Sequence, residues 1–284
     1  MDLRDLATLV AIAENGSLEA AARTLHVTAS AVSQRLAKLE DSFGDLLIIR
    51  EQPTRLTMAG EALLRTARQI DLLLHEVRQQ VGQVTETGPI TIAVHHDSLA
   101  AWFVPAMIMF QAETNRMLEI LAVDHTRTRS LLRAGSVAAA ISSDPDPLPG
   151  CEVDPIGALR YWAVSSPDKA ISAQEGTLPV IFFEKEDTPT SAALARKTNS
   201  PLSAVRCYIP SVADIEAAVT RGAGWAVLPE PLIADKLAKG DLVALDDEPA
   251  LEIGLFLHSW RSESRAIKSL RNAIQQAFSA AAKR

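Results

Sequence analysis

The segment from residue 18 to residue 50 contains two closely spaced helical patterns followed by a short strand pattern. Ser17 can cap a helix over 18–24, because its hydroxyl can accept a hydrogen bond from an otherwise unpartnered amide. Residues 25–27 predict a tight turn, and a second helix follows at once. This spacing is typical of a helix-turn-helix unit.

The second helix has one apolar face and one polar face. Side chains at spacings of three to four residues are expected to point inward; they are Ala31, Val32, Leu36 and Leu39. The opposite face is expected to carry Ala29, Ser30, Ser33, Gln34, Arg35 and Lys38. Gln and Arg can pair with adenine and guanine edges, and Ser, Lys and a helix amino end can hold phosphate oxygens. We therefore expect this helix to enter a DNA groove.

A wing is expected next to this helix. Residues 46–49 predict a short strand, and a turn follows at 52–54. Arg50 and Arg55 flank the turn and place basic side chains on the wing. The alternative is a plain three-helix bundle whose surface charges have no role, but the wing and the helix after it favour DNA binding.

The net charge of −7 does not exclude DNA binding, because the local potential of the reading surface matters more than the total. Glu40, Asp41 and Asp45 nevertheless lie close to that surface in the sequence. We therefore expect modest non-specific affinity and a specificity that depends on two reading heads. That requirement predicts a dimer.

A long helix from residue 59 onward can supply the dimer contact. Its apolar side chains alternate spacings of four and three, as in a coiled-coil seam; they are Leu63, Ala67, Ile70, Leu74, Val77 and Val81. No Pro or Gly interrupts the stretch between Gly60 and Gly82. The alternative is an amphipathic helix packed on its own domain. Residues 85–89 are expected to form a short hinge.

From residue 90 the pattern alternates between strands and helices, which predicts a parallel sheet with crossover helices. We expect strands at 90–94, 118–123, 137–142, 160–166, 178–183, 205–209, 225–229 and 253–260, and helices at 99–112, 127–134, 191–197, 212–221 and 264–281. These elements predict two similar-sized α/β lobes of Rossmann-like type, joined by crossing strands around a cleft, as in periplasmic binding proteins.

The expected organisation is therefore a winged helix-turn-helix domain at 1–58, a linker helix and hinge at 59–87, and an α/β effector domain at 88–284. Within the effector domain, lobe I is expected to include about 88–160 and 258–284, and lobe II about 161–257.

The runs SAVSQRLAKLEDSFGDLLIIR and LTMAGEALLRTA resemble the LysR-type transcriptional regulators, and the order of later elements agrees with that family. The resemblance implies that Ser30, Ser33, Gln34 and Arg35 read the groove and that Arg50 and Arg55 contact the DNA backbone. It also implies an antiparallel dimer contact through the linker helix. The chain departs from the family at Ala29 and Ser30, where Gln-Pro or Gln-Ser is common.

Ligands of open α/β sheets sit near the carboxyl ends of strands. The first such end carries Asp97 and Ser98, and Ser98 is expected to cap the next helix and to offer a site for a carboxylate. Asp97 beside it suits an ammonium group, so the pair fits an amino acid. The alternative is that both residues only cap the helix.

Other strand ends offer further candidates. Asp124 and Asp144 can each accept a cationic side chain or be solvated loop residues. From the second lobe, Tyr161 and Trp162 lie near the crossover, and Ser211 with Val212 begins a helix, where Ser211 can bind ligand or act as a simple cap. The full set of expected effector contacts is Asp97, Ser98, Trp102, Asp124, Ser142, Asp144, Trp162 and Ser211.

The stretches VHHDSLAAWFVPAM, VSQRLAKLE and REQPTRLTMAG resemble the branch of the family that regulates lysine and arginine export, often called ArgP or LysG. This resemblance implies a basic amino acid as effector and an amino-acid exporter or related gene as target. The alternative is an architectural or replication-control DNA-binding protein that responds to no effector.

No catalytic triad, metal-ligand cluster, P-loop or three-glycine nucleotide motif occurs in a fitting context, so we expect neither an enzyme nor a cofactor or metal. No apolar run approaches the roughly 20 residues that span a bilayer, and the amino terminus lacks signal-peptide features. The expected location is the cytoplasm, without membrane contact. The expected partners are double-stranded promoter DNA, further copies of the chain in a homodimer or homotetramer, and RNA polymerase.

Overall fold

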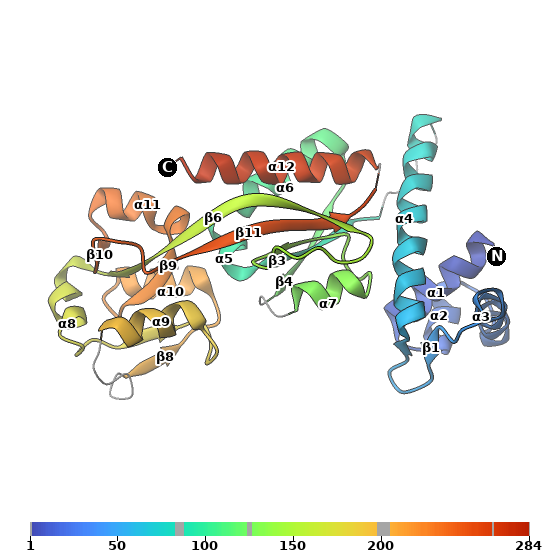
Figure 1. Ribbon diagram of the computed structural model, residues 1–284, viewed down its shortest axis with the longest axis horizontal. Helices are drawn as coiled ribbons and strands as arrows, with labels where there is room; N and C mark the ends of the chain where they lie inside the picture. The colour runs from blue at the N-terminus through green and yellow to red at the C-terminus, as the bar shows by residue number, and fades with distance from the viewer. Residues whose placement is uncertain (1, 83–87, 124–126, 198–204, 263, 284) are drawn as a thin grey trace.

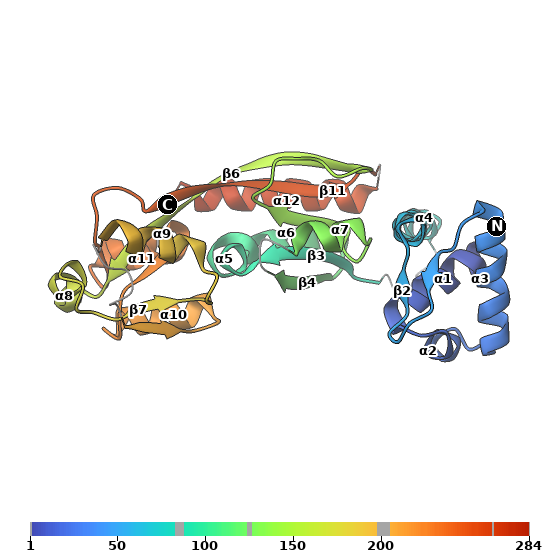
Figure 2. The same cartoon turned by 60° about the horizontal axis from the view of Figure 1, so that its bottom comes forward.

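The computed structural model describes residues 2–82, 88–123, 127–197, 205–262 and 264–283. An amino-terminal helical unit and an α/β unit lie on either side of one long helix (Figures 1 and 2). Among the described residues, no helix has the length and apolar character needed to cross a membrane.

The amino-terminal unit contains α1 (Leu3–Asn15), α2 (Leu18–Thr24) and α3 (Ala29–Phe43), followed by the antiparallel pair β1 (Ile48–Ile49) and β2 (Arg55–Leu56). The Ser17 hydroxyl caps α2 by accepting a hydrogen bond from the Ala20 amide at 3.1 Å, and Thr28 caps α3 in the same way. The predicted helix-turn-helix and wing are therefore confirmed at the level of the backbone.

The long helix α4 (Met58–Gln80) has two different halves. Its first half buries Leu63, Leu64 and Ala67 against the core of the amino-terminal unit. Near and just beyond its end, Val77 and Val81 are exposed. The predicted apolar seam is thus divided, because its early positions pack within the same chain and its late positions remain on the surface.

The main sheet has the strand order β10-β6-β11-β5-β3-β4, and β9 pairs with β6. Its strands are β3 (Ile90–His95), β4 (Leu118–Val123), β5 (Ala139–Ser142), β6 (Cys151–Ser165), β9 (Ala226–Pro229), β10 (Val243–Ala244) and β11 (Leu251–Trp260). Strand β3 is parallel to β4 and β5, whereas β11 runs antiparallel to β5 and β6. The expected parallel sheet is therefore a mixed sheet. A separate parallel pair joins β7 (Val180–Phe182) and β8 (Arg206–Tyr208).

Strands β6 and β11 run side by side from one lobe into the other (Figures 1 and 2). The sequence pattern indicated only the last part of β6, because Pro155 and Gly157 interrupt its first part. Gly157 has a φ of 152°, and a Cβ atom there would lie 2.3 Å from the Phe278 ring. A glycine is required at this position because the helix above approaches the strand so closely.

Helices cover the sheet on both sides. In lobe I they are α5 (His96–Ser98), a π-helical turn (Leu99–Phe103), α6 (Val104–Thr114), α7 (Thr128–Arg133) and α12 (Arg265–Ala281). In lobe II they are α8 (Ala170–Gln174), α9 (Thr188–Lys197), α10 (Val212–Thr220) and α11 (Glu230–Lys239). Helices α8 and α11 were not predicted from the sequence. Helix α12 packs beside α6 and spans the length of lobe I (Figure 1).

Candidate DNA-reading helix and effector cavity

Helix α3 has the two faces that its sequence predicts. Val32, Leu36 and Leu39 are fully buried, whereas Ala29, Ser30 and Gln34 are exposed. Ser33 and Arg35 are half-buried at the edge of the exposed face. The helix thus presents short polar side chains near its amino end, where close approach to DNA is sterically easiest.

Lys38 makes a contact that its position in the sequence does not predict. Its ammonium group lies 2.9 Å from the carboxylate of Asp5 on α1, and the Asp5 side chain is only 5% exposed. Burial alone would raise the pKa of Asp5, but the hydrogen bond from Lys38, the Asp2 amide and nearby positive charge hold that pKa below its ordinary value. Lys38 therefore joins α3 to α1 in addition to lying on the exposed face.

The wing carries Arg50 directly after β1 and Arg55 on β2, and both are exposed. The Thr54 amide donates to the Gly16 carbonyl at 2.8 Å, which holds the wing turn against the α1–α2 connection. Glu40 accepts a hydrogen bond from the Leu47 amide at 3.0 Å. One of the acids near the reading surface is thus engaged in positioning the wing strand.

A second candidate site is a cavity of about 330 Å³ between the two lobes. His96 and Asp97 line it from lobe I, and Phe183 and Val212 line it from lobe II. Its lining includes four carboxylate side chains, those of Asp97, Glu184, Glu186 and Asp187. No Lys or Arg is among the described residues that line it. The electrostatic potential of such a cavity favours a cation.

Asp97 is oriented by Tyr161, a residue of the crossing strand β6. The Tyr161 hydroxyl donates a hydrogen bond of 2.8 Å to Asp97 Oδ2. Burial, followed by the negative charge and hydrogen bond of Asp97, raises the pKa of Tyr161 well above its ordinary value. Tyr161 is therefore a neutral donor that fixes the orientation of the Asp97 side chain at the cavity.

The other acids follow β7 in the run FFEKED. Asp187 accepts hydrogen bonds from the amides of Phe183 and Thr190, each at 2.9 Å, and so fixes the loop before α9. The Phe183 ring lies 4.8 Å from the His96 ring, a contact between the two lobes. These residues were not predicted from the sequence, although the strand-end rule that selected Asp97 also applies after β7.

Ser98 does not cap a helix. Helix α5 begins at His96, so Ser98 lies within the helical run, and its buried hydroxyl has no hydrogen-bond partner among the described residues. The expected cap is wrong because the strand ends one residue later and the helix starts three residues earlier than the sequence pattern indicates. Trp102 does not line the cavity either; its ring packs edge-on against Phe278 at 5.1 Å in the lobe I core.

Asp144 is engaged elsewhere. Its carboxylate forms an ion pair with Arg129 and accepts from the Asp146 amide at 2.8 Å. The hydrogen bond from Asp146 and the charge of Arg129 lower the pKa of Asp144 despite the opposing effect of desolvation. The Ser142 hydroxyl accepts from the Asp144 amide at 3.1 Å, so both residues shape this loop, and Ser143 lines the cavity in their place. Asp124 lies outside the described residues.

In lobe II, neighbouring residues of β6 point to opposite faces. Tyr161 therefore faces the cavity, whereas Trp162 packs against the lobe II core and donates to Glu230 at 3.3 Å. Ser211 accepts from the Asp214 amide at 3.3 Å and caps α10. Of the two roles expected for Ser211, the helix cap is the one that the structure contains. Val212 beside it lines the cavity.

Two family models match the chain: the bacterial regulatory helix-turn-helix protein, lysR family, over residues 3–61, and the LysR substrate binding domain over residues 83–279. The chain belongs to the LysR family. This LysR-family chain is 36% identical over 279 residues to the lysine export transcriptional regulatory protein LysG of Corynebacterium efficiens, covering 96% of both chains. It is 34% identical over 282 residues to the transcriptional regulator ArgP of Escherichia fergusonii, covering 96% of this chain and 95% of that one.

Solved structures of LysR-family proteins agree with this assignment. The chain is similar to full-length LysG from Corynebacterium glutamicum with bound effector Arg, with a TM-score of 0.84, 32% identity and 99% of each chain covered. It is similar to ArgP from Mycobacterium tuberculosis with a TM-score of 0.85, 33% identity and 98% of each chain covered. The predicted fold class and the predicted LysR-type transcriptional regulator, as opposed to an enzyme, are confirmed.

Proposed function

We propose that this LysR-family regulator binds promoter DNA and responds to a basic amino acid, lysine or arginine, that occupies the cavity between its lobes. The observation that carries the proposal is the cavity lining, with four carboxylates and no cationic side chain among the described residues. Neighbouring acids favour the cation of such a ligand over a neutral or anionic molecule. The arginine-bound LysG structure supports the same class of effector.

In this proposal the Asp97 carboxylate, held by Tyr161, receives an amino group of the ligand. Ser98, next to Asp97, is the candidate for the ligand carboxylate: its buried hydroxyl has no partner among the described residues, although Ser98 is not among the residues that line the cavity in this structure. Glu184 and Glu186 face a cationic side chain from lobe II. The ligand then bridges both lobes, so its binding favours a particular arrangement of the lobes.

For DNA recognition, Ser30, Ser33, Gln34 and Arg35 contact base edges, and Arg50 and Arg55 contact the phosphate backbone. A target gene for an amino-acid exporter or a related function fits this scheme, with changed promoter bending and RNA polymerase recruitment as the output.

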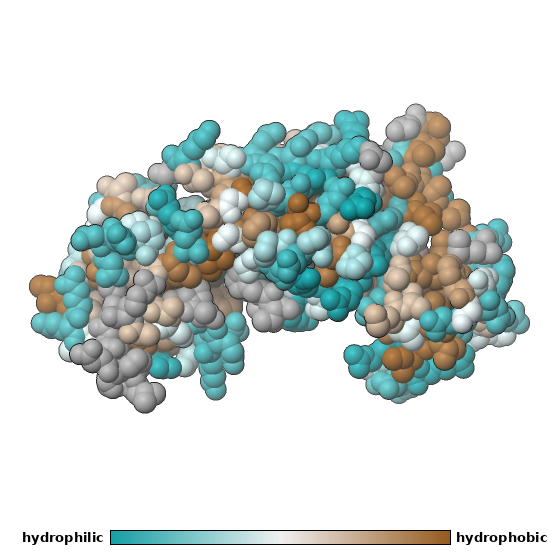
Figure 3. Space-filling model, in the orientation of Figure 1, coloured by the Kyte–Doolittle hydropathy of each residue, from teal (hydrophilic) through white to brown (hydrophobic). Residues whose placement is uncertain are grey.

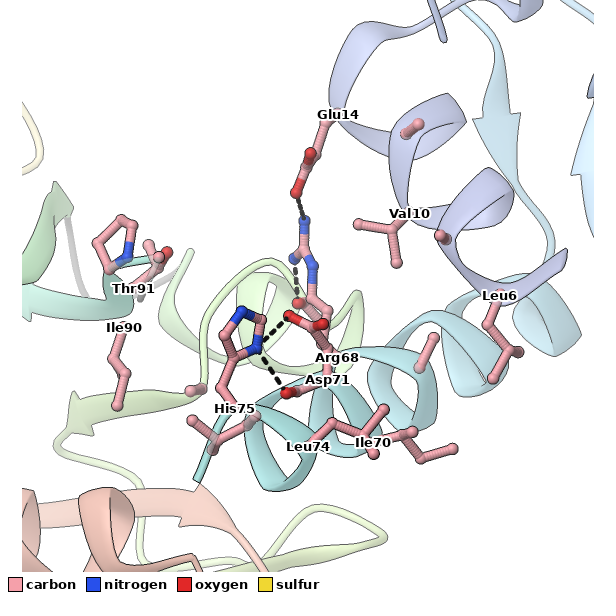
Figure 4. A pocket seen from close by; sticks show the side chains of 18 of the residues that line it. Leu6, Val10, Glu14, Arg68, Ile70, Asp71, Leu74, His75, Ile90 and Thr91 are labelled. Atoms are coloured by element: carbon pink, nitrogen blue, oxygen red, sulfur yellow. Dashed lines mark hydrogen bonds and ion pairs between the residues drawn. The ribbon is translucent and has the colours of Figure 1, made fainter. Parts of the chain in front are cut away.

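A second copy of the chain is the proposed partner along α4. A groove of about 880 Å³ lies between α1, α4 and lobe I, and Leu6, Val10, Ile70 and Leu74 line it (Figure 4). Hydrophobic side chains also lie along the outer length of α4 (Figure 3). An apolar helix face of this kind fits the same helix of another copy, which would bring two reading helices into one dimer.

Thermal unfolding with free amino acids tests the effector. Arginine or lysine at a hundredfold excess over its dissociation constant should stabilise the folded protein by about 2.7 kcal/mol. Citrulline, which has nearly the shape of arginine without its charge, is the matched control and should give a much smaller shift. Equal shifts with arginine and citrulline, or no shift with any basic amino acid, would contradict the proposal.

A further inference from the structure

The linker helix α4 contacts the carboxyl end of α7 and the turn directly after it through two arginines. Arg65 Nη1 donates to the Arg133 carbonyl at 3.1 Å, and Arg68 donates to the Gly135 carbonyl. The last carbonyls of a helix carry partial negative charge and lack partners within the helix, so cations bind them well. Gly135 has a φ of 70°, and a Cβ atom there would lie 3.1 Å from the Arg65 backbone. The linker helix and the end of α7 are therefore in close contact.

The same linker helix contacts the amino end of α12 through an acid. Glu76 accepts hydrogen bonds from the Ser264 hydroxyl and from the amides of Arg265 and Ala266, at 3.2 and 3.1 Å. A carboxylate at this end complements the partial positive charge of the 17-residue helix α12. Helix α4 thus places arginines at the carboxyl end of α7 and a carboxylate at the amino end of α12. These contacts fix its position on lobe I.

The other end of α7 contacts the effector cavity. Thr128, the first residue of α7, has its hydroxyl 3.2 Å from His95 Nε2, and His95 lines the cavity. Both side chains are buried. Helix α7 has six residues and is therefore only about 9 Å long. One short helix consequently touches a wall of the cavity at one end and the linker helix at the other.

We propose that α7 is the element that couples effector binding to the DNA-binding unit, with Thr128 as its contact to the cavity and Arg65 and Arg68 as its contacts to the linker helix. This inference rests on the proposed function, because it requires a ligand in the cavity. A ligand that moves His95 changes the position of α7. The hydrogen bonds between the carbonyls at the far end of α7 and the arginines of the linker helix then change as well, which shifts the linker helix. We call Thr128, Arg65 and Arg68 positioning residues. None of them lines the effector cavity, and none lies on the reading helix α3.

The test compares Thr128→Val with Thr128→Ser. Valine keeps the volume of the side chain but removes its hydroxyl, and serine keeps the hydroxyl. Operator affinity is measured for each protein with and without saturating arginine, and arginine affinity is measured by calorimetry. The wild type and Thr128→Ser should show the same arginine-dependent change in operator affinity. In Thr128→Val that change should be smaller by about fivefold or more, a factor in the range of ordinary allosteric coupling.

A second pair of variants tests the far end of α7. Arg65→Met removes a contact with the α7 carbonyls and should also reduce the arginine response. Glu14→Gln is the control, because it weakens the 3.0 Å contact of Arg68 with α1 and leaves the contacts of Arg65 and Arg68 with the end of α7 in place (Figure 4). Glu14→Gln should keep the response. Thermal unfolding of each variant verifies that it is folded.

The outcomes separate the two proposals. A wild type that responds to arginine, together with Thr128→Val and Arg65→Met variants that respond equally, would overturn the coupling role of α7 alone. A wild type that binds no basic amino acid would overturn the proposed function and the coupling that rests on it. Loss of response in Thr128→Val with rescue in Thr128→Ser would support the coupling.

Discussion

Tyr161 on the crossing strand β6 donates a 2.8 Å hydrogen bond to Asp97, a residue 64 positions earlier in the chain. The bond joins the strand that links the lobes to the first strand end of lobe I. It places a negatively charged oxygen in the cavity and holds it in one orientation. The proposed recognition of a ligand amino group depends on this pair.

Asp97→Asn should weaken arginine binding by about 10- to 100-fold, because a hydrogen bond to a charged group contributes about 1.5–3 kcal/mol. Tyr161→Phe keeps the carboxylate and removes only the hydroxyl that orients it, so its loss should be smaller. Isothermal titration calorimetry with arginine measures both. Unchanged affinity in Asp97→Asn would show that the ligand amino group binds elsewhere.

Asp144→Asn should leave arginine affinity within about twofold of the wild type, since the carboxylate is paired with Arg129 and not directed at the ligand. The same titration measures this variant beside Asp97→Asn, which makes the two carboxylates internal controls for each other. A large loss of affinity in Asp144→Asn would mean that its ion pair with Arg129 opens when ligand binds.

Arg35→Ala should weaken specific operator binding by about 1–3 kcal/mol and leave arginine binding unchanged. Ser42→Ala, near the other end of α3, is the control on the same helix and should bind the operator normally. Fluorescence anisotropy with operator and scrambled duplexes separates specific from non-specific binding. If Arg35→Ala binds the operator as the wild type does, another face of the helix reads the bases.

The Lys38–Asp5 pair predicts a pH dependence of stability. The pKa of Asp5 is lowered in the folded protein, so its contribution is present above the unfolded pKa of about 3.9 and is lost as the pH falls through the folded value. Asp5→Asn should therefore be less stable than the wild type at pH 7 by about 1 kcal/mol. The difference should shrink in urea titrations below pH 4. A difference that is constant from pH 7 to pH 3 would contradict this role of Asp5.

Local elements of this chain follow from nearby residues. Ser17, Thr28 and the buried series Val32, Leu36 and Leu39 predict α2 and α3 because caps and helical periodicity involve residues only a few positions apart. Sequence periodicity likewise identifies the strands after residue 90, with the exceptions of the two-residue strand β10 and the first part of β6. There Pro155 and Gly157 break the pattern, and only pairing with β11 maintains the strand.

The site residues were predicted less completely. The strand-end rule selected both Asp97 and Asp144, and the structure assigns them different surroundings. Asp144 meets Arg129, which lies on α7, whereas Asp97 meets Tyr161 and the cavity. Sequence spacing contains no information on which of two similar carboxylates already has a cationic partner.

The sequence by itself determined the helix-turn-helix and most of the later strands and helices, because these depend on short-range hydrogen bonding and periodic burial. Its motifs also indicated the family. Only the tertiary structure decided that Tyr161 orients Asp97, that Lys38 is tied to Asp5, and that α7 lies between the cavity and the linker helix. Those relationships depend on the register of β6 and β11 and on helix packing. These bring together residues tens of positions apart through many weak contacts, which no single stretch of sequence encodes.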